Sequence, residues 1–131
     1  MKRKEIPIVT LEKLIETVVT IKGQQFDSEI ITGWINEIEG QAIDEVFNQA
    51  NGVSIEFIPY DYKTDSDKKL YIPDRFQDVY ANYIYSKMDF LNQETERYNN
   101  DVVMFNAAYE SFTSWFLRNN KQKSNRYFSG F

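Results

Sequence analysis

The chain has 131 residues, of which 42% are hydrophobic and 16% aromatic; this is enough for one domain with a real core and too much for a disordered protein. It contains no Cys and no His, which excludes disulfides, thiol chemistry, His-based triads and His-ligated metal sites. Residues 5–117 carry 20 acids against 8 bases, whereas residues 118–131 carry four bases and no acid. The excess of negative charge over residues 5–117 repels nucleic-acid phosphate, which argues against a sequence-specific DNA-binding domain.

Two features of the sequence concern location. No segment approaches the roughly 20 apolar residues that a membrane helix needs. The basic N-terminus lacks the apolar stretch of a signal peptide. We therefore expect a protein without membrane contact that is made and kept in the cytoplasm.

The first predicted elements follow a short leader. We expect residues 1–9 to be flexible and residues 10–118 to form a single helical domain. The first helix is predicted to start after Thr10 as its N-cap and to run to about residue 21, because Gly23 then stops it. Its apolar face consists of Leu11, Leu14, Ile15 and Val18.

A second helix is predicted after Asp27, whose side chain is a suitable cap, and it ends before Asn51-Gly52. Its apolar stripe has spacings of three and four and consists of Ile31, Trp34, Ile35, Ile38, Ala42, Ile43, Val46 and Phe47. Gly40 lies inside this helix, where glycine costs on the order of 1 kcal/mol relative to alanine. We therefore expect Gly40 to allow the close approach of another backbone.

The pattern then changes from helical to alternating. Val53, Ile55 and Phe57 alternate with polar residues, which indicates a strand that ends at Pro59. After a polar loop, residues 69–72 form a second short candidate strand, which Pro73 stops. The two segments would pair as a hairpin, remain an extended loop, or offer edges to a neighbouring chain.

Two long helices are predicted to follow, from about 74 to 91 and from about 94 to 118. The first carries the stripe Phe76, Tyr80, Tyr83, Ile84, Met88 and Leu91. The second carries a seam with coiled-coil spacing, formed by Tyr98, Val102, Phe105, Tyr109, Phe112 and Phe116. The sequence thus predicts a mainly α protein. It would be a small bundle of about four helices with a long antiparallel C-terminal helix hairpin and a short β-hairpin or extended loop at about 53–72.

The second of these helices is apolar on more than one face. Its further apolar residues are Val103, Met104, Ala107, Ala108 and Trp115. A helix that is apolar on several faces needs more than one partner. We expect another subunit to cover part of this surface.

The sequence offers little for catalysis or cofactor binding. One acidic loop contains Asp61, Asp65 and Asp67. A calcium loop starting at Asp65 would place Lys69 and Leu70 where an oxygen ligand and a glycine are needed. Glu37 and Glu39 lie two residues apart on a helix and so point in different directions. No nucleotide-binding glycine loop or nucleophile elbow is present, so we expect no enzyme, no metal and no cofactor.

Aromatic stripes are also typical of platforms that stack single-stranded nucleic acid. Such platforms need interleaved bases. The last predicted helix has Arg97 near its start and Arg118 at its end, with Asp101 and Glu110 between them. We therefore interpret the aromatic stripes as core.

Several stretches resemble a known family when taken in order. They are residues 10–15 (TLEKLI), 34–40 (WINEIEG), 45–47 (EVF), 59–61 (PYD), 70–73 (LYIP), 79–80 (VY), 88–90 (MDF), Glu94, 97–100 (RYNN), 105–109 (FNAAY), Phe112 and 115–116 (WF). Together they resemble the small head–tail adaptor (connector) proteins of tailed bacteriophages and prophages. The resemblance covers about residues 10–118, and the leader and the tail lie outside it.

The resemblance implies a structural part of the virion. Such adaptors form a ring beneath the portal protein, expected to be twelvefold, which extends the DNA channel and docks the stopper or tail-completion protein. DNA would pass through without specific binding, and the isolated chain would be a monomer or a ring. The protein would lie at the head–tail interface of the virion, and in the host cytoplasm during assembly. The alternatives are a tail-side or head-completion protein, or a cytoplasmic helical protein–protein interaction module.

Two groups of residues are candidates for contacts with partners. We expect residues 119–131 to be a flexible tail that docks on the portal or on a neighbouring subunit, with bases that steer and aromatic rings that anchor. The docking residues would be Lys121, Lys123, Arg126, Tyr127, Phe128 and Phe131. Candidates for intersubunit contact or close packing are Trp34, Glu37, Glu39, Gly40, Tyr71 and Trp115.

Overall fold

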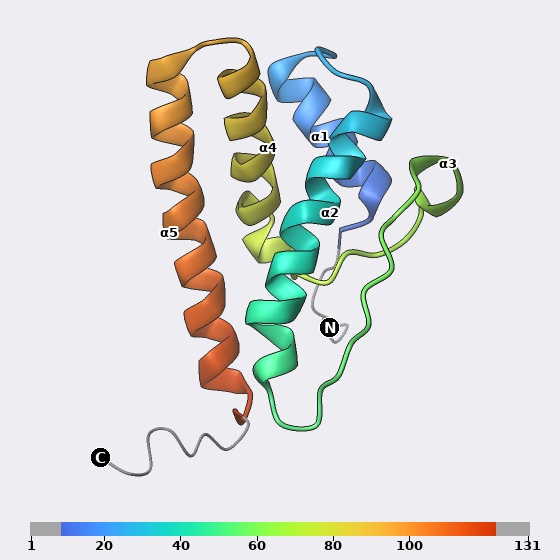
Figure 1. Ribbon diagram of the computed structural model, residues 1–131, viewed down its shortest axis with the longest axis vertical. Coiled ribbons are helices and arrows are strands. Elements are labelled where there is room, and N and C mark those ends of the chain that lie inside the picture. Colours follow the sequence, from blue (N-terminus) through green and yellow to red (C-terminus); the bar gives the residue numbers. More distant parts are fainter. Residues whose placement is uncertain (1–8, 123–131) are drawn as a thin grey trace, which may run out of the picture.

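The computed structural model describes residues 9–122, which form five α-helices and two 3₁₀ turns and contain no β-strand (Figure 1). The prediction of a mainly α, small helical bundle is confirmed. α4 and α5 stand side by side as a hairpin, while α2 crosses in front of α1 in this view. α2 and α4 pack on each other, and α1 contacts both of them. None of the helices within residues 9–122 is long and apolar enough to cross a membrane.

α1 (Leu11–Lys22) begins and ends as predicted. The Thr10 hydroxyl accepts a hydrogen bond from the backbone N–H of Lys13 at 3.2 Å, which satisfies one of the free donors of the first turn. Gly23 ends the helix with φ of 86°, a left-handed value that glycine adopts without steric cost. The predicted apolar face of α1 is buried.

α2 (Ser28–Glu45) starts at the predicted place, but the predicted capping role of the Asp27 side chain is wrong. That side chain makes no capping hydrogen bond, and only the backbone carbonyl of Asp27 accepts from the first turn. The helix ends at Glu45, and a 3₁₀ turn follows (η1, Phe47–Gln49). This turn places the ring of Phe47 5.0 Å from that of Phe116, so Phe47 packs on α5 instead of extending α2.

The C-terminal hairpin consists of α4 (Asp78–Leu91) and α5 (Thr95–Asn119). Gln93, in the turn between them, has a positive φ of 59°. A 3₁₀ turn (η2, Asp74–Phe76) precedes α4, which therefore starts later than the predicted residue 74. The reason is local, because the N–H of Phe76 bonds to the carbonyl of Pro73 three residues back and so makes a tighter turn than an α-helix.

No β-hairpin forms within residues 53–72, so the extended-loop alternative holds. Residues 53–60, which we call the extended segment, run along α2 and lead to α3 (Tyr62–Asp65) (Figure 1). The second predicted strand pairs elsewhere. The N–H of Leu70 bonds to the carbonyl of Val9, and the N–H of Leu11 bonds to the carbonyl of Lys68, each at 2.9 Å. Residues 68–70 therefore pair with the residues just before and at the start of α1. The backbone groups used in this pairing are not available for a hairpin with residues 53–58.

The core lies between α1, α2, α4 and the C-terminal part of α5. Of the residues predicted for the α4–α5 seam, Tyr80, Phe112 and Phe116 are buried. Tyr98, Phe105 and Tyr109 are half-buried. The difference arises because only the C-terminal part of α5 also meets η1 and η2, where the ring of Phe112 lies 5.6 Å from Phe47 and 5.8 Å from Phe76.

We expect Phe112→Ala to lower the free energy of unfolding by about 3–5 kcal/mol, because it leaves a cavity where three elements meet. Val103→Ala, at a position of the same helix that is 63% exposed, should change it by less than about 0.5 kcal/mol. Denaturant unfolding followed by circular dichroism measures both changes. Equal losses in the two variants would contradict this view of the core.

Candidate interaction surface

The carboxylate of Glu39 on α2 is fully buried and accepts three hydrogen bonds. The hydroxyl of Tyr80 donates to Oε1, and the hydroxyl of Tyr60 donates to Oε2 at 2.7 Å. The backbone N–H of Tyr71 also donates to Oε2, at 2.8 Å. The Tyr80 oxygen in turn accepts from the N–H of Ile72 at 2.9 Å. One carboxylate thus joins α2 and α4 to the two ends of the loop from 60 to 72.

Burial controls the electrostatics of this cluster. It raises the pKa of Glu39, and the hydrogen bonds from Tyr80, Tyr71 and Tyr60 counteract the rise. Burial and the adjacent Glu39 charge raise the pKa values of Tyr60 and Tyr80, so both phenols keep their protons. Since both phenols remain donors, the cluster is a fixed structural joint.

Two asparagine side chains hold the extended segment against the helices. Asn48 accepts from the N–H of Ile55 at 2.7 Å and donates to its carbonyl at 2.9 Å. Asn36 does the same for Tyr60, at 2.8 and 3.1 Å. Each amide thereby makes the pair of bonds that a residue of a neighbouring strand would make.

Gly40 faces the extended segment. A Cβ built at Gly40 would lie 3.7 Å from the ring of Phe57, which is an ordinary van der Waals distance. The expectation that Gly40 admits another backbone is therefore wrong, since its neighbour is an aromatic side chain. Phe57 itself is half-buried, and its ring lies 5.4 Å from that of Tyr60.

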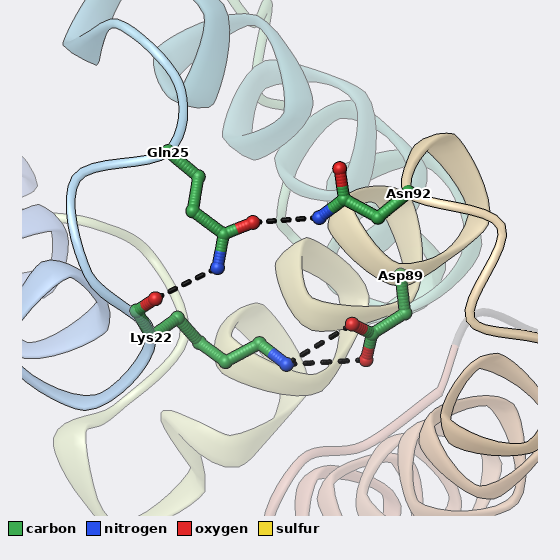
Figure 2. Close-up of polar contacts among 4 residues, drawn as sticks. All are labelled: Lys22, Gln25, Asp89 and Asn92. Atoms are coloured by element: carbon green, nitrogen blue, oxygen red, sulfur yellow. Dashed lines mark hydrogen bonds and ion pairs between the residues drawn. The ribbon is translucent and has the colours of Figure 1, made fainter.

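A second polar cluster joins the C-terminal ends of α1 and α4 (Figure 2). The ammonium group of Lys22 lies 3.1 and 3.2 Å from the two carboxylate oxygens of Asp89. The amide of Asn92 donates to that of Gln25 at 2.6 Å, and Gln25 donates to the carbonyl of Lys22 at 2.7 Å. These contacts fix the top of the α4–α5 hairpin against α1.

Asp101 of α5 completes this cluster from the other side. It is buried, and its Oδ2 atom has no hydrogen-bond donor among the described residues. Burial, then the hydrogen bond and charge of Asp89, raise the pKa of Asp101 to about 7. Burial alone would raise the pKa of Asp89 too, but the hydrogen bond from Asp101 and the charge of Lys22 outweigh it and lower that pKa. Of the two carboxyl groups, Asp101 is therefore the one that binds a proton first as the pH falls.

Apolar side chains are exposed on both helices of the α4–α5 hairpin. Val103 and Met104 on α5 are 63% and 49% exposed. Phe90 and Leu91 at the end of α4 are 63% and 55% exposed, and the ring of Phe90 lies 5.4 Å from that of Tyr98. We call Phe90, Leu91 and Tyr98 the hairpin surface. A groove beside it is lined by Tyr83, Ser86, Lys87, Phe90, Tyr98, Val102, Phe105 and Asn106.

The structure uses several of the candidate interface residues inside the chain. Trp34 is buried with its ring 5.3 Å from that of Phe26, and Glu39 is buried as described. Trp115 is half-buried, and the guanidinium of Arg75 lies 6.0 Å above its ring. These side chains pack within the monomer.

The remaining candidates lie nearer the surface. Glu37 is exposed, accepts from the hydroxyl of Tyr83 at 2.6 Å and pairs with Lys87 at 3.2 Å. Tyr71 is 40% exposed, and Lys121 is exposed. The other predicted docking residues lie outside the described part of the chain: Lys123, Arg126, Tyr127, Phe128 and Phe131.

Sequence reasoning missed the roles of the buried acids. Glu39 lies four residues after Ile35 and three before Ala42, on the apolar stripe of α2. Asp101 lies three residues after Tyr98 and four before Phe105, on the seam of α5. An acid at a position of an apolar stripe signals a buried carboxylate that needs partners. The sequence contained this signal, but it does not name the partners.

Comparison of the chain with protein-family models, with curated proteins and with solved structures finds no match.

We expect Glu39→Gln to lower the free energy of unfolding by about 1–3 kcal/mol, because an amide presents its own donor to groups that already donate. Asp44→Asn, at an exposed position of the same helix, should change it by less than about 0.5 kcal/mol. Denaturant unfolding of both variants at neutral pH measures the two changes in the free energy of unfolding. Similar values for the two variants would show that the buried cluster does not stabilise the fold.

Asp101→Asn should change how the melting temperature depends on pH. The folded protein binds the Asp101 proton with a pKa of about 7, against an ordinary value of 3.8, so this group lowers the stability as pH rises from about 4 to about 7. The lowered pKa of Asp89 acts only below its ordinary value of 3.8, outside that range. We therefore expect Asp101→Asn to gain in melting temperature relative to the parent between pH 5 and pH 8.

The control for this measurement is Glu96→Gln, an exposed position in the first turn of α5. Its difference from the parent should stay constant over the same pH range. A constant difference for Asp101→Asn as well would mean that Asp101 holds no proton in the folded protein.

Proposed function

We propose that this protein is a structural head–tail adaptor of a tailed bacteriophage or prophage, and not an enzyme. In this role it forms a ring beneath the portal, extends the DNA channel and offers a platform to the stopper or tail-completion protein. Its partners are the portal, the stopper and its own neighbours in the ring. It acts in the virion after assembly in the host cytoplasm.

The observation that carries the proposal is the hairpin surface. Phe90 and Leu91 are exposed beside Tyr98, although the rest of the domain is well packed. An exposed apolar patch of this kind marks a surface that another protein or subunit covers. The order and spacing of the family-like stretches over residues 10–118 support the same role. The hairpin is held to the bundle at its top by Lys22 and Asp89, so it presents this surface rigidly.

The charge distribution suits a conduit for DNA. Residues 5–117 carry 20 acids against 8 bases, and a ring of such bodies would not grip the phosphate backbone. Low adhesion would let DNA move through the channel. The basic and aromatic residues 121–131 are suited to dock on an acidic partner surface, either of the portal or of a neighbouring subunit in the ring.

The exposed apolar surface also fits the alternatives: a tail-side or head-completion protein, or a cytoplasmic helical interaction module. Location distinguishes them. An adaptor is present in DNA-filled particles in a fixed ratio to the portal, a tail protein is present in isolated tails, and an interaction module is absent from particles.

The test is quantitative mass spectrometry of purified DNA-filled particles from a producing host. We expect about one copy of this chain per portal subunit, as stacked rings of matched symmetry require. Phe90→Glu should lower incorporation about tenfold, since it places a charge in the proposed contact. Ile21→Glu is the matched control, because Ile21 is also 63% exposed but lies on α1.

The controls are the folded state of both variants and the amount of major capsid protein in each preparation. Absence of the chain from particles would overturn the adaptor role. Equal incorporation of Phe90→Glu and Ile21→Glu would leave the role standing but remove the hairpin surface from it.

A further inference from the structure

The extended segment is bonded to the rest of the chain at two points. Asn48 occupies the backbone groups of Ile55, and Asn36 occupies those of Tyr60. In the part of the chain that the structure describes, the backbone N–H and C=O groups of Ser54, Glu56 and Ile58 have no hydrogen-bond partner. In an extended chain the backbone groups of these three residues point away from those of Ile55, so they form a free edge between the two points of attachment.

The side chains of this segment also follow a strand pattern. Val53, Ile55 and Phe57 are half-buried, whereas Ser54 and Glu56 are exposed. Isoleucine is among the residues most often buried, but Ile58 is 76% exposed. Its backbone belongs to the unpaired edge. An extended segment with an exposed, unpaired backbone edge is a template for the addition of another extended segment.

A hollow lies next to this edge. It is lined by Glu56, Phe57, Ile58, Tyr60, Asp65, Lys68, Lys69 and Tyr71. This lining combines aromatic and aliphatic side chains with two acids and two lysines. A strand added to the edge would bring alternate side chains to this hollow, where an aromatic ring finds apolar contact.

The chain pairs with itself just before the extended segment. After α5, Asn120 has extended backbone angles (φ −141°, ψ 132°). The N–H of Asn51 bonds to the carbonyl of Lys121 at 2.7 Å, and Gln122 forms an antiparallel bridge with Ala50. Residues 121–122 therefore pair with residues 50–51, which a turn at residues 51–52 separates from the extended segment.

The bridge between Gln122 and Ala50 is antiparallel. In an antiparallel pair the partner positions run in opposite directions, so a pairing continued past Gln122 would come opposite residue 49 and not residue 51. A pairing continued in this register would lead away from residues 54–58 of the same chain.

We propose that residues 123–131 of a second copy of this chain add as a β-strand to the free edge at residues 54–58. Nine residues span about 30 Å when extended, and the edge is about 17 Å long, so the tail has length to cover it and to bridge two copies. Because the tail of one copy meets the body of the next, the contact is head-to-tail and is able to close a ring.

Charge and side-chain type favour this occupant. Residues 9–122 carry 19 acids and 10 bases, whereas residues 123–131 carry Lys123 and Arg126 and no acid. The free edge itself carries Glu56, which is exposed. Tyr127 and Phe128 are residue types that favour strands, and no proline interrupts this part of the sequence. This inference deepens the proposed function, since it names a contact between ring subunits, but its tests use purified protein only.

The first test measures the binding of a fluorescent synthetic peptide of residues 121–131 to the full-length protein by anisotropy. Glu56→Pro removes one unpaired N–H of the free edge, and Glu56→Ala keeps it. We expect saturable binding that Glu56→Pro weakens about tenfold, because it removes one backbone hydrogen bond, and that Glu56→Ala changes by less than about threefold. Circular dichroism confirms that both variants are folded.

The second test uses the absence of cysteine from the chain. Full-length Ile58→Cys and full-length Tyr127→Cys are mixed and mildly oxidised, so any mixed disulfide joins two copies. We expect this mixture to form more crosslinked dimer than Tyr127→Cys mixed with Thr17→Cys, which lies on the exposed face of α1.

Equal crosslinking in the two mixtures would overturn the inference, as would peptide binding that is absent or insensitive to Glu56→Pro. In either case the tail would be left for another partner, such as the portal. None of these outcomes bears on the presence of the chain in particles, so failure of this contact is distinguishable from failure of the proposed function.

Discussion

The buried carboxylate of Glu39 is the constraint on which the rest of the structure depends. A charge at that depth is tolerated only if donors surround it, and Tyr60, Tyr80 and the Tyr71 backbone provide them. These donors come from the loop that joins the two halves of the bundle and from α4. Satisfying one carboxylate therefore fixes the path of that loop, and with it the position of the extended segment along α2 (Figure 1).

The buried acids Asp89 and Asp101 are stabilised in a different way from Glu39. Glu39 keeps its place by accepting three hydrogen bonds, whereas Asp101 lies beside Asp89, which pairs with Lys22. The donors in the first arrangement are two phenols with raised pKa values and a peptide N–H, so they keep their protons at neutral pH. In the second arrangement burial and the neighbouring Asp89 raise the pKa of Asp101 to about 7.

Together these joints position two surfaces that lie on different elements. The hairpin surface belongs to α4 and α5, and the extended segment runs on the other side of α2 from this hairpin in the view of Figure 1. Unlike surfaces on different elements suit contacts of the head-to-tail kind, which close into rings or extend into filaments. This geometry agrees with the proposed adaptor role and would equally serve any assembly in which each copy meets two neighbours.

The sequence by itself determined the helices, because caps, glycine stops and apolar spacing are local signals. Thr10 and Gly23 delimit α1 as predicted, and the α5 seam placed Phe112 and Phe116 in the core. Only the tertiary structure decided where the extended residues pair, since alternation predicts a strand but not its partner. Residues 68–70 bond to the chain before α1, and side-chain amides stand in for the strand missing beside residues 53–60. The same holds for Glu39 and Asp101, because the donors that make a buried acid tolerable come from residues far away in the sequence.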